Sequence, residues 1–234
     1  MRPQLHRRHL RRRSARFHGD LPAMKTISLV AGLTLLVLLA ILLVANFGEA
    51  SFTIHMIIHM GTVAFAAPLV AHALTGSTYR KKMPFVERIT PMPASFIELV
   101  VVWFWHVPAI RAAADASSAL SVFEQISFFA AGLLLWFACL QPKEGRIAGA
   151  MGLLFTSMHM TLLGVLIALA PRPLYGNDDV TCFGIPLSAV SDQQMGGVFM
   201  LVAGAFSYLV GGLVLVAGLL REDHRTTPVE KPRW

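Results

Sequence analysis

The feature that most constrains this chain is a series of six apolar segments, each long enough to cross a lipid bilayer as a helix. A transmembrane helix needs about 20 mostly apolar residues to cross about 30 Å of hydrocarbon. The six segments are residues 26–46, 52–74, 94–113, 119–140, 148–170 and 196–220. Since hydrocarbon offers no water to the backbone, each segment must satisfy its own hydrogen bonds as a helix. The sequence therefore predicts an all-α integral membrane bundle of six transmembrane helices over residues 26–220.

The composition agrees with a membrane protein, because 55% of the residues are hydrophobic and only 14% are charged. The net charge of +7, taken alone, would also suit a nucleic-acid-binding protein. The basic residues, however, lie in the tails and at helix ends, and no basic face with interleaved aromatic residues is visible. We therefore expect contact with membrane lipid and no nucleic acid. Cys139 and Cys182 show no CxxC spacing, so the sequence supports neither a disulfide nor a thiolate metal site.

The distribution of basic residues predicts how the bundle is oriented. Lys and Arg gather in the N-terminal tail, in the second and fourth loops and in the C-terminal tail, whereas the other loops carry only Arg111 and Arg172. By the positive-inside rule, both termini are then cytoplasmic. Residues 1–25 form a basic cytoplasmic tail and residues 221–234 form a second one. Met24, followed by Lys25 and then the first apolar segment, offers an alternative start of translation within the first tail.

Two histidines in the second segment are the strongest polar signal in the chain. His55 and His59 stand four residues apart, which places both imidazoles on one helical face about one turn apart. Met56 and Met60 follow them directly, and thioether together with imidazole suits Cu(I) better than harder metals. The alternative is structural, with both imidazoles bonded to neighbouring helices. Polar residues inside membranes are rare and usually functional, so we favour a functional role.

With this orientation, polar residues from five segments reach the outer half of the membrane. His106 lies on the outer side of the third segment, where Pro108 is expected to bend the helix. Glu124 lies in the outer part of the fourth segment and His159 near mid-depth in the fifth, while Asp192 precedes the sixth and is equally suited to cap it. The candidate metal ligands are therefore His55, His59, His106, His159, Met56, Met60, Glu124 and Asp192.

Five stretches of the sequence, taken together, resemble one family. They are HMIIHM with the following APLVAH, WHVPAIRAAA, FEQISFFAAGLLLW, LGVLIALAPRPLY and DQQMGG. On these motifs the chain resembles the CtaG-type assembly factors of haem-copper cytochrome c oxidases, the family named for caa(3)-type oxidase assembly. The resemblance covers about positions 55–218, nearly the whole membrane domain. APRPLY and DQQMGG, in this order around an outside loop, are its most specific part.

The resemblance implies a multi-pass protein of the bacterial plasma (inner) membrane that is needed for a functional oxidase and is not an enzyme. It would bind copper or help deliver it, with cytochrome c oxidase subunits and a periplasmic copper carrier as partners. The family's conspicuous polar residues would be His55, His59, His106 and His159, with Asp192 in the last motif. Two departures stand out. Members usually have a histidine after the fourth-helix glutamate, where this chain has Gln125, and relatives often have seven spans instead of six.

Two other functions are consistent with the same residues. Histidines on two facing helices can be the axial ligands of haem in a membrane b-type cytochrome, although no nicotinamide or flavin motif accompanies them here. The same ligands could also line the route of a copper transporter. His72, near the cytoplasmic end, would extend that route, but polar residues thin out between mid-depth and the cytoplasm. We therefore favour the assembly factor, with copper as its cargo.

Overall fold

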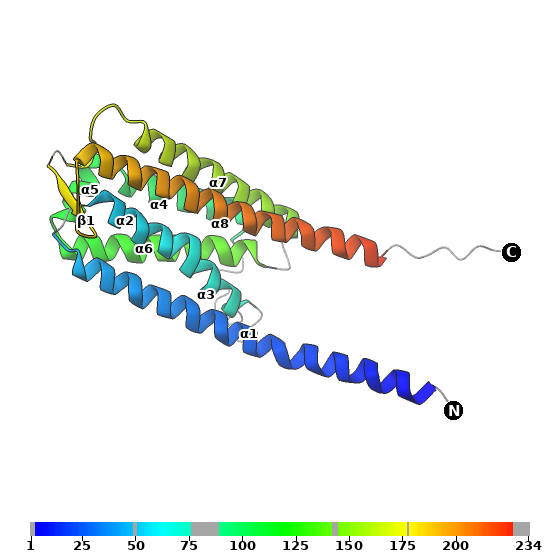
Figure 1. Ribbon diagram of the computed structural model, residues 1–234. Helices are drawn as coiled ribbons and strands as arrows, with labels where there is room; N and C mark the ends of the chain where they lie inside the picture. Colours follow the sequence, from blue (N-terminus) through cyan, green and yellow to red (C-terminus); the bar gives the residue numbers. More distant parts are fainter. Residues whose placement is uncertain (1–2, 49–50, 76–88, 142–144, 177, 227–234) are drawn as a thin grey trace.

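The computed structural model describes residues 3–48, 51–75, 89–141, 145–176 and 178–226, and within them the protein is a bundle of long helices (Figure 1). The predicted all-α membrane bundle is confirmed. In chain order the elements are α1 (Pro3–Ala45), α2 (Phe52–Met60), the π-helix η1 (Gly61–Ala66), α3 (Ala67–Leu74), α4 (Pro91–Trp105), α5 (Pro108–Asp115), α6 (Ser118–Cys139), α7 (Arg146–Ala168), β1 (Val180–Cys182), β2 (Ile185–Leu187) and α8 (Ala189–Thr226).

Five helices of the described chain are individually long and apolar enough to cross a membrane, and α4 with α5 makes a sixth span if the bent pair is counted as one. The two helices of this pair meet at a bend of 71°. The bend follows from Pro108, which has no N–H and forces the preceding Val107 into an extended conformation with ψ of 124°. The third predicted span is thus a broken helix, as its proline indicated.

The second predicted span is the most buried of the five described helices that are individually long enough to cross a membrane. It runs through α2, η1 and α3 over Phe52–Leu74, the range expected from the sequence. Of its most apolar 18 residues, 72% are buried, whereas the corresponding share for α1 is 11%. The π-turns of η1 begin directly after His59 and Met60, and π-turns frequently occur at functional sites. α1 lies at the edge of the bundle, and it begins at Pro3, so the predicted N-terminal tail continues the first helix.

The helices α7 and α8 approach each other closely at glycines. A Cβ on Gly197 of α8 would lie 2.7 Å from the backbone nitrogen of Ala168, and one on Gly164 of α7 would lie 3.0 Å from the carbonyl oxygen of Gly197. Small residues at such contacts let two helix backbones come together in a membrane. The neighbouring Gly196 leaves room for the ring of Phe52, so α8 also fixes the position of α2.

The two ends of the bundle differ in what they carry (Figure 1). α5 and the β1–β2 hairpin lie at one end, which we call the hairpin end, and the first residues of α1 and the last of α8 lie at the other, the terminal end. The two strands pair antiparallel, with Val180 opposite Leu187, and Phe183 and Gly184 turn between them at positive φ. The sequence predicted no element in this loop. The position of the start of α1 and the end of α8 at the same end of the bundle agrees with an even number of crossings.

Candidate functional site

Three imidazoles meet near the hairpin end of the bundle. His55 and His59 come from successive turns of α2, and His106 lies directly after α4. The ring centroids are 6.4 Å apart for His55 and His59, 6.1 Å for His55 and His106, and 5.4 Å for His59 and His106. Phe128 of α6 packs against all three rings and lies 4.0 Å from that of His59. The cluster therefore joins three helices that are distant in sequence.

The break after α4 orients His106. Its Nδ1 lies 2.6 Å from the carbonyl oxygen of Val102, and since a carbonyl only accepts, Nδ1 carries the proton. Nε2 then keeps its lone pair. This atom is buried and has no hydrogen-bond partner among the described residues. Proteins commonly use such a backbone bond on one ring nitrogen to orient the other toward a metal.

His59 is the most deeply placed of the three imidazoles, with 0% of its surface exposed. Neither of its ring nitrogens has a hydrogen-bond partner within the part of the chain that the structure describes. An unpaired polar group in a buried place costs about 1–3 kcal/mol. This state is the one expected of an imidazole that is kept free for a ligand.

A charged cluster borders the imidazoles on the side of α5 and α6. The buried guanidinium of Arg111 donates through Nη1 to Glu124 at 2.5 Å and also forms an ion pair with Asp115, one turn further along α5. The same Nη1 lies 2.9 Å from Nδ1 of His55. Because arginine only donates, this contact requires a neutral His55 that accepts. Nε2 of His55 lies 3.7 Å from Glu124, so the ring is held between a cation and a carboxylate.

Aromatic side chains cover the imidazoles at the hairpin end. The ring of Phe52 lies 6.0 Å from that of His55 and stacks on Tyr175, with centroids 4.1 Å apart and planes 5° apart. The Tyr175 hydroxyl donates to the carbonyl oxygen of His106 at 2.9 Å. Burial raises the pKa of Tyr175 above its usual value, so this hydroxyl keeps its proton and remains a donor. The loop after α7 is thereby fastened over the site.

Comparison with known protein families assigns the chain to one of them. The sequence model of the family described as cytochrome c oxidase caa3 assembly factor matches residues 5–222. The chain belongs to this family. The resemblance indicated by its motifs is therefore confirmed, and it extends beyond the membrane domain in both directions. Searches of curated proteins and of solved structures gave no match.

In this member of the caa3 assembly factor family, the two methionines of α2 are turned away from the imidazoles. Met56 and Met60 are fully buried against α8. A Cβ on Gly196 would lie 3.1 Å from Cγ of Met56, and one on Gly204 would lie 3.3 Å from Cε of Met60. Consecutive residues of a helix point about 100° apart, so the imidazoles beside them face α6 instead. The expected mixture of thioether and imidazole is therefore not assembled here, and the methionines pack the core.

His159 of α7 lies apart from the other three histidines. It is buried, and its ring contacts Phe155 at 5.8 Å, whereas no ring contact joins it to another imidazole among the described residues. Thr156, one turn earlier, hydrogen-bonds to Ser95 of α4, which places this side of α7 against α4. Both nitrogens of His159 are also buried without a partner in the described chain. The predicted depth therefore does not bring His159 into the cluster.

Asp192 caps α2 and not the helix that contains it. Its carboxylate accepts from the Ser51 hydroxyl at 2.9 Å and from the backbone N–H groups of Phe52 at 2.5 Å and Thr53 at 3.2 Å. These backbone donors belong to the first turn of α2, which leaves them without an intrahelical acceptor. One of the two roles expected of Asp192 was to cap its own helix, α8, but it caps α2 instead. This contact joins the start of α8 to the helix that carries His55.

Gln125 replaces the histidine that the resemblance leads us to expect, but it does not face the imidazoles. It lines a groove between α1, α2 and α6 that also contains Ile58 and Thr62. The preceding Glu124 points to Arg111 and His55 instead. This departure from the family pattern therefore removes no side chain from the cluster.

Sequence reasoning missed Arg111, which it assigned to an outer loop. The residue is only 5% exposed. Arg111 and Asp115 stand four residues apart soon after Pro108, and this spacing could have indicated a short helix with a charged pair on one face.

In the described ranges no three His, Cys, Asp or Glu side chains are placed to hold a metal ion together.

Proposed function

We propose that this protein is a non-enzymatic assembly factor of a haem-copper cytochrome c oxidase that receives Cu(I) at His59 and His106 and passes it to an oxidase subunit. Membership of the caa3 assembly factor family supports the oxidase as partner. The bundle of membrane-spanning helices supports a multi-pass membrane location, here the bacterial plasma membrane. The hairpin end then faces the periplasm, where a copper carrier supplies the ion.

The observation that carries the copper proposal is the pair of unpartnered imidazoles. Nε2 of His106 and both nitrogens of His59 are buried without a partner among the residues described, and the two rings lie 5.4 Å apart. Two imidazoles that share a metal ion through bonds of about 2 Å have centroids about 5–6 Å apart. The spacing of His59 and His106 is therefore suitable for one ion between them.

Cu(I) suits a pair of neutral imidazoles better than an ion that demands more ligands. Imidazole is a good copper ligand, and Cu(I) accepts a low coordination number, whereas zinc in proteins is almost always tetrahedral. A site with few ligands also favours transfer, because few bonds must be exchanged when the ion leaves. The Nδ1 lone pair of His55 already accepts from Arg111, so the pair of His59 and His106 is the one left free for the ion.

The packing around the imidazoles is unfavourable for the b-type cytochrome alternative. A haem with two axial histidines needs a flat slot between their rings. Phe128 lies 4.0 Å from the ring of His59 and 6.2 Å from that of His106. Its phenyl group fills the space beside both rings, so a haem would require α6 to repack.

The proposal is tested by Cu(I) binding to the detergent-purified protein and by oxidase activity in cells. The double variant His59→Ala/His106→Ala should bind Cu(I) at least about tenfold more weakly than the wild type, because both imidazole ligands are lost. Oxidase activity should fall with it, while the amount of inserted protein stays the same.

His72→Ala is the matched control, because His72 lies on the same continuous helix but is exposed. It should bind Cu(I) and support the oxidase as the wild type does. Unchanged copper binding and oxidase activity in the double variant would reject the copper site. A haem absorption band that disappears in the double variant would support the cytochrome instead.

A further inference from the structure

We infer that Arg111 sets the ion selectivity of this site: with Asp115 and Glu124 it leaves one net negative charge beside the imidazoles, which favours a soft monovalent cation over divalent ions. This inference rests on the proposed function, because it requires that a cation reaches the imidazoles. It assigns a role to a charged cluster that the metal ligands themselves do not explain.

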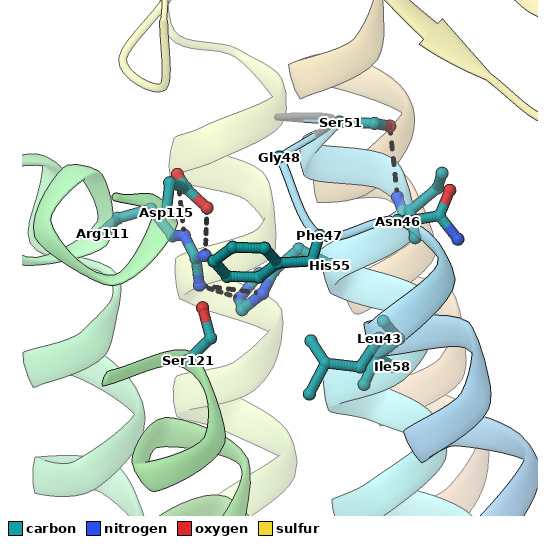
Figure 2. Close-up of a pocket in the computed structure, with 11 residues that line it drawn as sticks. Leu43, Asn46, Phe47, Gly48, Ser51, His55, Ile58, Arg111, Asp115 and Ser121 are labelled. Atoms are coloured by element: carbon teal, nitrogen blue, oxygen red, sulfur yellow. Dashed lines mark hydrogen bonds and ion pairs between the residues drawn. The ribbon is translucent and has the colours of Figure 1, made fainter. Parts of the chain in front are cut away.

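A cavity connects His55 to the surface (Figure 2). It has a volume of about 70 Å³ and lies between α1, α2, α5 and α6. Phe47, Gly48 and Asp115 line it where it is exposed, whereas His55 and Arg111 line its buried part. A cavity needs about 10–15 Å³ on this measure to hold one water molecule, so this cavity has room for an ion together with several water molecules.

Arg111 stands where this cavity meets the imidazoles. Its guanidinium lies between Asp115 and His55, with contacts to both (Figure 2). The ring of His55 is in turn 6.4 Å from that of His59 and within 7° of parallel to it. The arginine charge is therefore one imidazole away from the proposed ion, in an interior where charges interact more strongly than in water.

The charged side chains beside the imidazoles sum to one negative charge. The contacts with the Arg111 guanidinium favour the ionised carboxylates, and in that form Asp115 and Glu124 carry one negative charge each against the single positive charge of Arg111. The imidazoles count as neutral, which is the form that binds metal. The carboxylate of Asp192 is not counted here, because it accepts from the backbone at the N-terminus of α2, whose partial positive charge offsets about half of its own.

This balance discriminates between ions by their charge. One monovalent cation neutralises the site, whereas a divalent cation leaves one positive charge unbalanced at membrane depth, which is costly. Without Arg111 the same site would carry two negative charges and would suit a divalent ion. The arginine thus lowers the affinity for zinc-like ions more than the affinity for Cu(I).

The test is competition between Ag(I), a monovalent stand-in for Cu(I) without redox chemistry, and Zn(II) on the purified full-length protein. The wild type should prefer Ag(I), and Arg111→Gln should shift the ratio of the two affinities toward Zn(II) by at least about tenfold. Adding Glu124→Gln to this variant returns the net charge to one negative and should restore the preference for Ag(I). A purely structural role of the arginine predicts no such rescue.

Asp115→Asn keeps the buried pair of Arg111 and Glu124 and removes only the exposed carboxylate that pairs with Arg111. It therefore tests the inference even if Arg111→Gln fails to insert. It makes the site neutral and should weaken Ag(I) binding by about threefold or more. Arg172→Gln, an exposed arginine on the loop at the same end, is the control and should leave both affinities unchanged.

The outcomes separate this inference from the proposed function. A wild type that binds no Ag(I) would overturn both. A wild type that binds Ag(I), together with an unchanged metal preference in Arg111→Gln or no rescue in Arg111→Gln/Glu124→Gln, would overturn the role of Arg111 alone. Unchanged Ag(I) affinity in Asp115→Asn would do the same.

Discussion

At the scale of single residues, Asp192 shows how one carboxylate holds the site together from outside the imidazole cluster. It is 2% exposed, and besides its carboxylate contacts its own carbonyl oxygen accepts from the Thr53 hydroxyl at 2.8 Å. Hydrogen bonds to an ionised carboxylate are stronger than those between neutral groups. The first turn of α2, which leads directly to His55, is thereby fixed to α8.

We predict that Asp192→Ala lowers the free energy of unfolding by about 1–3 kcal/mol, because it leaves buried donors at the start of α2 without an acceptor. Asp192→Asn should lose less, since its amide oxygen still accepts. Chemical denaturation of the purified protein measures the difference, with Asp179→Ala in the exposed loop as control. An Asp192→Ala protein as stable as the wild type would show that α2 does not depend on this cap.

The sequence predicted part of this residue-level arrangement. Helix spacing and depth place His55, His59 and His106 at one level, and the structure brings their rings together. Their role as metal ligands stays a prediction. Which ring nitrogens are free could not be predicted, because it depends on the contacts of each ring. The inward position of Arg111 could not be predicted either, because it depends on how sharply the chain turns at Pro108.

At the scale of elements, long apolar helices were predictable and short polar ones were not. The range of the second span was predicted correctly because hydrocarbon thickness sets the length of an apolar helix. α5 and the β1–β2 hairpin lie where the chain leaves the apolar region, so no such length applies to them. The π-turns of η1 depend on local packing, to which Gly61 contributes by approaching Leu39 of α1.

The close contact of α7 and α8 gives a prediction at this scale. Gly197→Ala places a methyl group 2.7 Å from backbone and should lower the free energy of unfolding by about 1–3 kcal/mol. Gly212→Ala, on the same helix, has its nearest neighbour at 4.0 Å and should be neutral or gain up to about 1 kcal/mol from helix propensity. Thermal unfolding followed by circular dichroism compares the two. Equal stability of the two variants would contradict the importance of this contact.

At the scale of the whole molecule, the two ends of the bundle have separate characters. The imidazoles, the Arg111 cluster and the covering aromatic rings lie toward the hairpin end, and the start of α1 and the end of α8 lie at the terminal end. The basic residues predict that the terminal end is cytoplasmic. A periplasmic source of copper is consistent only with this orientation, so orientation and function must be tested together.

We predict that the hairpin end is accessible from outside the cell and the terminal end is not. In a Cys139→Ser/Cys182→Ser background, Asp179→Cys marks the hairpin end and Arg221→Cys marks the terminal end, and both positions are exposed. A membrane-impermeant maleimide should label Asp179→Cys in intact cells and Arg221→Cys only after the membrane is opened, because basic flanks are retained in the cytoplasm. The reverse pattern would show that the imidazoles lie toward the cytoplasm, and it would exclude a periplasmic carrier as the source of their copper. Labelling of both positions in intact cells would contradict the separation of the two ends by the membrane, and with it the bundle of spanning helices that connects them.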